Sequence, residues 1–223
     1  MGILSCERRL FRGHVACIGA LLVAHSLLHA LRRLNADGSM TPLWPWFDLN
    51  GESNLPATFS ALALLLAAYL LFSVASAVRR AGQPHHVPWL LLGAVFVVLA
   101  IDEAAGLHEL LNRPVRGALH AGGIFYFAWV VPYAALLSLL LLALWRFMLD
   151  LAPDTRRWFV VAGAVYVGGA LLLEMVGARI WDNGGAAGRS YCVVTTIEEV
   201  LEMLGIAIFV RALVAHRRRI RAA

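Results

Sequence analysis

The sequence contains no lysine, so its net charge of +5 comes entirely from arginine. No basic stretch is interleaved with aromatic residues, which argues against a nucleic-acid interface. Cysteine is scarce as well: Cys6, Cys17 and Cys192 are odd in number and form no CxxC pair. Neither a disulfide framework nor a thiolate metal site is therefore expected. Periodic repeats and disordered linkers are also lacking, so we expect one domain, a single transmembrane domain over 1–223.

Apolar residues are abundant instead. They make up 61% of the chain, and the mean hydropathy is +0.73, well beyond the values of a soluble domain. Six runs are long enough to cross a hydrocarbon core of about 30 Å as helices. The predicted fold class is therefore all-α, a polytopic transmembrane helix bundle in contact with membrane lipid. The six predicted spans are 14–34, 57–78, 88–111, 124–148, 157–180 and 191–215.

The arginines predict the orientation of these spans. If the N-terminus is cytoplasmic, thirteen arginines fall on the inner side: Arg8, Arg9, Arg12, Arg79, Arg80, Arg146, Arg156, Arg157, Arg211, Arg217, Arg218, Arg219 and Arg221. Six fall outside: Arg32, Arg33, Arg113, Arg116, Arg179 and Arg189. The positive-inside rule then places both termini in the cytoplasm. We expect a multipass protein of the cell inner membrane.

Acidic residues within the apolar segments are the main candidates for function. A buried ionised carboxylate costs several kcal/mol unless it is paired, protonated or bound to a cation. Acids and one histidine of this kind lie in the third, fifth and sixth predicted spans: Asp102, Glu103, His108, Glu109, Glu174, Glu198, Glu199 and Glu202. These eight residues form the predicted site.

Depth and helical phase predict that acids of these three spans meet, although on a straight third span only Asp102 and Glu109 align, while Glu103 and His108 diverge. At 1.5 Å per residue, Asp102 lies about 14 Å below residue 111, Glu174 about 9 Å below residue 180, and Glu198 about 10 Å below residue 191. Glu198, Glu199 and Glu202 share one side of their helix because offsets of three and four return to one face. A further expectation concerns Gly163, Ala170 and Gly177, whose heptad spacing predicts a small-residue ridge that another helix approaches closely.

Glutamates with a histidine in a helix bundle are the donor set of dinuclear iron and manganese sites. The Glu-x-x-His repeats of those proteins are absent here, and DExxxxHE and EExxE stand in their place. We therefore predict a site for a divalent metal ion, either iron, manganese or zinc, with His108 as nitrogen ligand. A metal-dependent redox enzyme is one possible role, but no catalytic residue and no organic cofactor site can be assigned.

Two other classes of function stay open. Chains of acids and histidines also form relays in ion- or proton-coupled transporters, although the inner halves of these spans supply few polar residues. Alternatively, protonated acids bonded to each other and to Arg113, Arg116 or Arg179 hold together a non-catalytic subunit, with a membrane-protein partner or a second copy of the chain. Further residues that could join the site from the first span or the outer loops are His25, His29, Asp48, Glu52 and His120.

Three segments resemble a family of uncharacterised bacterial multipass proteins: FDLNGESNLPATFS at 47–60, DEAAGLHE at 102–109 and TIEEVLEMLG at 196–205. The resemblance covers most of the chain. It implies a shared six-helix architecture and carries no established activity.

A second resemblance is superficial. His25-Ser26-Leu27-Leu28-His29 is similar to the HxxxH element of alkaline-ceramidase-like membrane hydrolases, which hold zinc. In that family the element belongs to a late helix, whereas here it lies in the first span, and the many glutamates have no counterpart. The resemblance would imply zinc-dependent amide hydrolysis, with a metal-bound water as nucleophile and one glutamate as general base.

Overall fold

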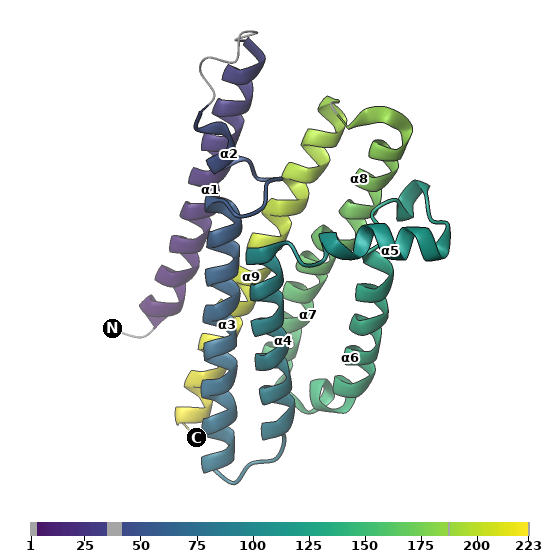
Figure 1. The fold of residues 1–223 in the computed structure, drawn as a ribbon. Coiled ribbons are helices and arrows are strands. Elements are labelled where there is room, and N and C mark those ends of the chain that lie inside the picture. Colours follow the sequence, from purple (N-terminus) through teal and green to yellow (C-terminus); the bar gives the residue numbers. More distant parts are fainter. Residues whose placement is uncertain (1–3, 35–41, 187, 223) are drawn as a thin grey trace.

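The structure, a computed structural model, describes residues 4–34, 42–186 and 188–222. Within these ranges the regular elements are helices, and no strand is present. The all-α prediction is therefore confirmed. Long helices run up and down the bundle in chain order (Figure 1): α1 (Leu4–Leu34), α3 (Leu55–Arg80), α4 (His86–Ala105), α6 (Val130–Asp150), α7 (Pro153–Val167) continuing into α8 (Glu174–Ile180), and α9 (Arg189–Ala222).

Shorter elements lie between them. Helix α2 (Trp44–Phe47) belongs to the connection from α1 to α3, and α5 (Glu109–Leu119) lies across the bundle between α4 and α6 (Figure 1). A 3-10 turn, Gly123–Phe125, follows α5. Two π-helical stretches, Gly168–Leu173 and Trp181–Gly185, flank α8. Such π stretches are frequent at functional sites.

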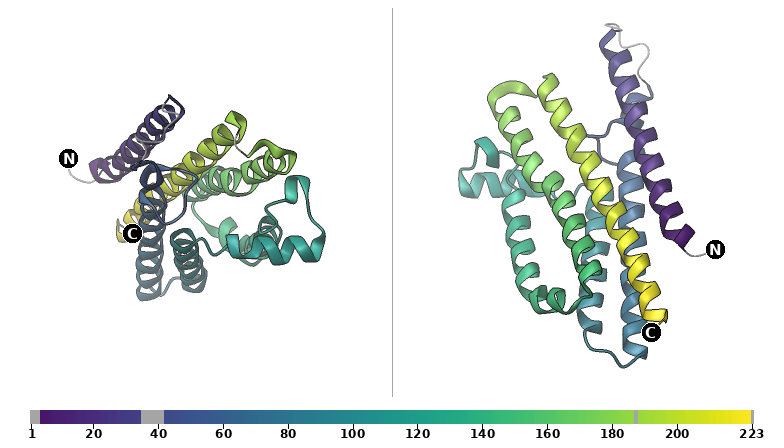
Figure 2. Two further views of the ribbon diagram at one scale, coloured as in Figure 1. Left: turned by 45° about the horizontal axis from the view of Figure 1, so that its top comes forward. Right: turned by 180° about the vertical axis from the view of Figure 1, so that it is seen from behind.

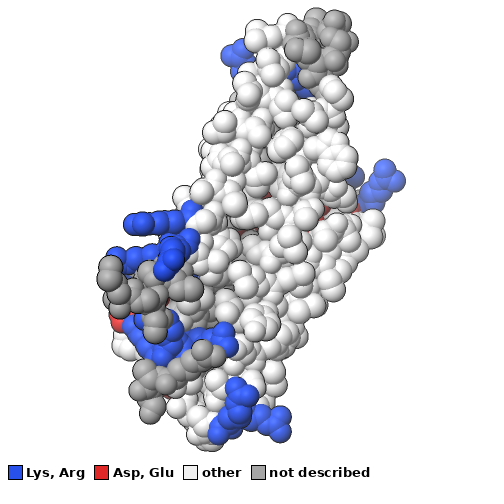
Figure 3. Space-filling view, turned by 90° about the vertical axis from the view of Figure 1, so that its left-hand side faces the viewer, with Lys and Arg blue, Asp and Glu red and all other residues white. Residues whose placement is uncertain are grey.

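Among the described residues, five helical segments are long and apolar enough to cross a membrane: Glu7–Leu34, Leu55–Arg80, His86–Ala105, Val130–Asp150 and Pro153–Gly185. Helix α9 is 34 residues long, but its glutamates and arginines interrupt its apolar stretch, so it does not belong to this group. One face of the molecule has scarcely any charge across its middle, and arginines gather toward the end where α9 stops (Figure 3). These features are those of a multipass membrane protein.

Helix α9 runs through the middle of the bundle between α3 and α7, while α1 lies at its edge against α9 (Figure 2). Helix α3 begins where the Asn54 side chain caps it by accepting the N–H of Ala57 at 3.1 Å. Its alanine-rich face lets neighbours approach, and Leu71 and Val74 are fully buried there. From α9, Val210 and Leu213 complete this core. The packing fixes the height at which the acids of α9 face the other helices.

The predicted third span, 88–111, is too long. Helix α4 ends at Ala105 because Gly106 adopts a left-handed conformation (φ 58°) and its N–H donates to the Asp102 carbonyl. Glycine carries no Cβ and takes this conformation without strain. Asp102 therefore lies about 5 Å below the end of its helix, not 14 Å. The predicted fourth span, 124–148, likewise begins later, at Val130.

The predicted ridge of Gly163, Ala170 and Gly177 is also not where helices approach most closely. A Cβ on Gly163 would meet nothing within 4 Å, and one on Gly177 would reach only the Tyr191 ring at 3.5 Å. The close approaches lie at Gly169 and Gly205. A Cβ on Gly169 would stand 2.8 Å from the Glu198 carbonyl oxygen, and one on Gly205 2.7 Å from the Tyr166 nitrogen. Because these two glycines have no side chain, the α7–α8 segment packs closely against α9 at both positions.

Candidate functional site

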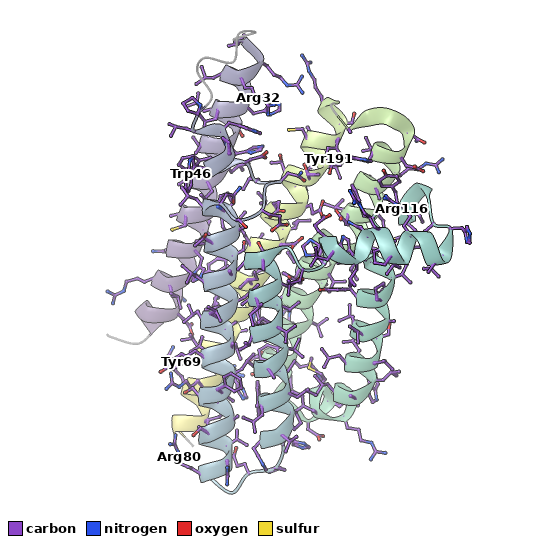
Figure 4. The ribbon with its side chains drawn as sticks, in the orientation of Figure 1. Arg32, Trp46, Tyr69, Arg80, Arg116 and Tyr191 are labelled. Carbon is purple, nitrogen blue, oxygen red and sulfur yellow. The ribbon has the colours of Figure 1, made fainter. Side chains whose placement is uncertain are left out.

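The predicted acids lie near one another at the level where α5 crosses the bundle. We call them, with Glu52, the acidic cluster: each member interacts electrostatically with at least one other. Arg116 on α5 and Tyr191 on α9 border this level in Figure 4. The members are Glu52, Asp102, Glu103, His108, Glu109, Glu174, Glu198, Glu199 and Glu202.

The turn after α4 folds His108 back onto Asp102. The His108 backbone N–H donates to Asp102 Oδ1 at 2.7 Å, and Nδ1 of the ring lies 3.3 Å from the same oxygen. The other ring nitrogen, Nε2, lies 3.9 Å from a carboxylate oxygen of Glu52 and of Glu109. Burial opposes protonation of this imidazole, but the Asp102 hydrogen bond and charge outweigh it and raise the pKa of His108.

Glu52 joins the cluster from the loop before α3. Its side chain is 46% exposed, and a Cβ on Gly106 would lie 3.4 Å from its carboxyl carbon. Partial burial raises the pKa of Glu52, although the charge of His108 opposes this. From the sequence, Glu52 was only a possible further residue of the site; in the structure its carboxylate lies 3.9 Å from the His108 ring.

Trp129 links α5, α6 and α8 at the site. Its indole N–H donates to Glu174 Oε1 at 2.9 Å, and its ring centroid lies 4.7 Å from that of His108. Its backbone N–H donates to Asn112 Oδ1 at 3.3 Å, and the Asn112 amide donates to Glu109 Oε2 at 2.9 Å. Sequence reasoning missed Trp129 and Asn112, because neither belongs to a charged motif. The one available signal was a polar Asn112 close to the acidic segment.

On α9, Glu198 has the smallest solvent-exposed fraction of the three glutamates, with 7% of the residue exposed. Its carboxyl group contacts that of Glu174. The oxygen Oε2 is buried and has no hydrogen-bond partner. The contact at Gly169 holds the backbone of Glu198 close to the π-helical stretch Gly168–Leu173, which precedes α8. A carboxylate oxygen in this position lacks the partner that buried polar atoms normally have.

The charge of the cluster is unbalanced: eight carboxyl groups face one imidazole. The ion pairs of Arg218 with Glu7 and of Arg219 with Asp154 lie away from the cluster. Arg116, considered above as a partner for the acids, instead lies 4.3 Å over the Tyr126 ring and donates to the Tyr126 carbonyl. Protons or a bound cation must therefore neutralise the cluster.

Among the side chains that the structure describes, those of residues 7–34, 42–186 and 188–220, no three His, Cys, Asp or Glu side chains are arranged to hold one metal ion. The acids share a neighbourhood without converging on a point. Coordination of a metal would thus require rotation of some carboxylates. Glu174 and Glu109 could keep their hydrogen bonds to Trp129 and Asn112 in that case, because carboxylates that bind a metal are commonly also hydrogen-bonded.

His25 and His29 belong to a different contact. The Leu49 N–H donates to His25 Nδ1 at 3.0 Å, and Asp48 lies 3.7 Å from the same nitrogen. His29 lies 3.8 Å from Cys192 Sγ. These side chains connect α1 to the loop between α2 and α3 and to α9. A fourth candidate, His120, is exposed at the C-terminal end of α5, in a left-handed conformation.

One family model, described as Domain of unknown function (DUF8692), matches residues 15–217. No curated protein and no solved structure matches the chain.

Proposed function

The chain belongs to the family described as Domain of unknown function (DUF8692), and from the residues of its site we propose that it is an integral membrane protein that binds a cation. The cation that we propose is a divalent metal ion, iron, manganese or zinc, held by the acidic cluster. We also propose six spans, with α9 as the sixth, both termini in the cytoplasm, and the bacterial inner membrane as the location. The excess of arginine on the side of the termini supports this orientation.

The observation that carries the proposal is the unpartnered Oε2 of Glu198. An ionised oxygen buried in this way costs several kcal/mol, and a bound cation removes that cost. Glu174, which contacts the same carboxyl group, adds a second negative charge that a cation would stabilise. The proposed ligands are therefore Glu174 and Glu198, with Glu199, Glu202, Glu103 and Glu109 as further oxygen donors.

The pair of Asp102 and His108 supports a nitrogen ligand. Metal-bound histidines commonly donate one ring N–H to a carboxylate, which fixes the tautomer and leaves the other nitrogen for the metal. Here Asp102 accepts on the Nδ1 side and Nε2 faces the carboxylates of Glu52 and Glu109. With this donor set, iron or manganese would support redox chemistry and zinc would activate water.

A second candidate, ion- or proton-coupled transport, is favoured by one observation. Since no three donors converge in the described residues, the carboxyl groups could instead carry protons and exchange them during a transport cycle. The π-helical stretch Gly168–Leu173 next to Glu174 supplies a segment whose hydrogen bonding can change. A non-catalytic subunit that uses the acids for assembly is the third candidate.

Elemental analysis of the purified protein tests the proposal. We expect stoichiometric iron, manganese or zinc in the wild type and its loss in Glu198→Gln. The matched control is Glu7→Gln, because Glu7 pairs with Arg218 far from the cluster, and this variant should retain the metal. A folded wild-type protein without metal would overturn the proposal. Uptake of a labelled cation or of protons by proteoliposomes would then favour transport, and a co-purifying membrane protein the subunit role.

A further inference from the structure

Arg211 lies on α9 within the segment that we propose as the sixth span, about 9 Å before Arg217 along the helix. Its guanidinium carbon lies 5.4 Å from the centroid of the Phe11 ring on α1 and 5.2 Å from that of the Trp158 ring on α7. Both distances are in the range of cation–π contacts. Seen from behind, α9 lies between α1 and α7 (Figure 2). Aromatic rings of two neighbouring helices therefore hold this cation on α9.

A second guanidinium group lies at the same indole ring. The guanidinium carbon of Arg157 is 5.9 Å from the Trp158 centroid, so two positive charges share one aromatic neighbour. Like charges this close repel each other, and the repulsion is larger where the effective dielectric constant is low. Arg8 and Arg12, which are exposed on α1 on either side of Phe11 in the sequence, add further positive charge.

The acidic side chains at this end of the bundle each lie within ion-pair distance of another basic side chain: Glu7 of Arg218, Asp154 of Arg219, and Asp150 of His85. Among the residues that the structure describes, no carboxylate and no carbonyl accepts a hydrogen bond from Arg157 or Arg211. An arginine within a spanning helix normally pairs with an anionic or carbonyl group. A bound anion would supply this partner for both arginines.

The surroundings indicate that the anion belongs to a phospholipid. Exposed Val15 on α1 and exposed Val160 on α7 continue from this level toward the middle of the bundle, on helices that are long and apolar enough to cross a membrane. The arginines themselves lie toward the end of the molecule where basic residues gather (Figure 3). Basic sites between spanning helices bind phosphate head groups, and a guanidinium can donate two parallel hydrogen bonds to a phosphate.

We propose that Arg157 and Arg211, held by Trp158 and Phe11, bind the phosphate of an anionic phospholipid. Both guanidinium groups donate to phosphate oxygens, and the acyl chains lie along the apolar faces of α1 and α7. A zwitterionic phospholipid carries a cation in its head group, which the arginines repel, so the anionic lipid is preferred. This site shares no residue with the acidic cluster and does not depend on the proposed metal.

Native mass spectrometry of the detergent-purified protein tests this, with dioleoyl phosphatidylglycerol and dioleoyl phosphatidylcholine as probes. We expect the wild type to bind the first lipid about tenfold more tightly, a preference that one charge-assisted hydrogen bond is enough to supply. Arg211→Gln and Arg157→Gln should each lose most of this preference. The control is Arg146→Gln, which removes an exposed arginine from α6 at the same end of the bundle and should keep the preference.

Three results would overturn the site. The first is equal affinity of the wild type for the two lipids. The second is an equal loss of preference in Arg211→Gln and Arg146→Gln, because overall charge would then account for it. The third is displacement of the bound lipid by an excess of inorganic phosphate, which would exclude a phospholipid as the specific occupant. Arg157 is exposed, so Arg157→Gln decides the test if Arg211→Gln does not fold. Neither variant should change the metal content, since Arg211 lies about 13 Å along α9 from Glu202.

Discussion

Replacement of Gly169 by alanine tests whether the contact between the α7–α8 segment and α9 holds the site together. The added Cβ would stand 2.8 Å from the Glu198 carbonyl oxygen, 3.1 Å from Glu202 Cγ and 3.3 Å from the Glu202 nitrogen. Two of these three atoms belong to the backbone, so rotation of a side chain cannot relieve the contact. The helices must separate by several tenths of an ångström.

The magnitude follows from two opposing effects. Overpacking of a tight interface costs about 1–3 kcal/mol, whereas alanine in a helix interior gains up to about 1 kcal/mol over glycine. We expect Gly169→Ala to be destabilised by about 1–2 kcal/mol overall. The matched control is Gly163→Ala, where a Cβ meets nothing within 4 Å. That variant keeps the helix-forming gain and should be as stable as the wild type or slightly more so.

The assay is unfolding of the detergent-solubilised protein, followed by circular dichroism, with elemental analysis of the same samples. For a chain of this length, about 1 kcal/mol corresponds to roughly 2–4 °C in Tm. Gly169→Ala should therefore melt several degrees below Gly163→Ala. It should also retain less metal, because Glu198 and Glu202 move away from Glu174. Equal stability and equal metal content of the two variants would refute the inferred role of this contact.

Three further predictions address other parts of the molecule. Trp129→Phe removes the N–H donor to Glu174 and should lower the free energy of unfolding by about 1–3 kcal/mol in the same melting assay. The control Trp46→Phe changes an exposed tryptophan and should have little effect on stability. Similar losses of stability in both variants would contradict the hydrogen bond from Trp129 to Glu174. Gly106→Ala places a side chain in a left-handed turn, at a cost of about 1–2 kcal/mol, and should also lower the metal content because His108 shifts. The control is Gly82→Ala, where φ is also positive but an added Cβ would meet nothing within 4 Å. This variant should be strained to a similar degree and yet keep its metal. Burial, aided by Arg219, lowers the pKa of His216 to about 4. The neutral ring therefore stabilises the fold above pH 6.5, the ordinary pKa of histidine, and this stabilisation is lost as the pH falls from 6.5 toward 4, by at most about 3 kcal/mol. In melting curves across this pH range, His216→Phe should lose less stability than the wild type, and equal losses in both would contradict this role of His216.

Much of the fold could be predicted because apolar runs of membrane length have few alternative structures. The strongest case is the span that became α3, predicted as 57–78 and found as Leu55–Arg80. The end of the third span could not be predicted, because residues 106–111 continue the apolar pattern with Leu107 and Leu110. Helix α4 ends because Gly106 is in the left-handed conformation. The φ angle of a glycine within an apolar run cannot be predicted from the sequence alone.

Helical phase places Glu198, Glu199 and Glu202 on one side of α9, but the depth predicted for Asp102 was wrong because α4 ends early, and the hydrogen-bond partners of the acids could not be predicted. Acidic side chains at similar depth on neighbouring helices avoid lipid by pointing into the bundle, where they lie near each other. The partners Trp129 and Asn112 act from another helix and from a transverse segment, and only the tertiary arrangement brings them to Glu174 and Glu109. The close contact at Gly169 was missed for the same reason, since spacing along one helix does not reveal where a second helix crosses it.

The shortness of α4 has a consequence for water. Its 20 residues span about 30 Å, the thickness of the hydrocarbon layer itself. A bilayer matched to this helix places Asp102 and Glu103, within a single turn of its end, beside the hydrated head groups. Ions dissolved on that side of the membrane would then reach these carboxylates without crossing the hydrocarbon interior, and the energetic penalty for ionising them would be far smaller than at mid-bilayer.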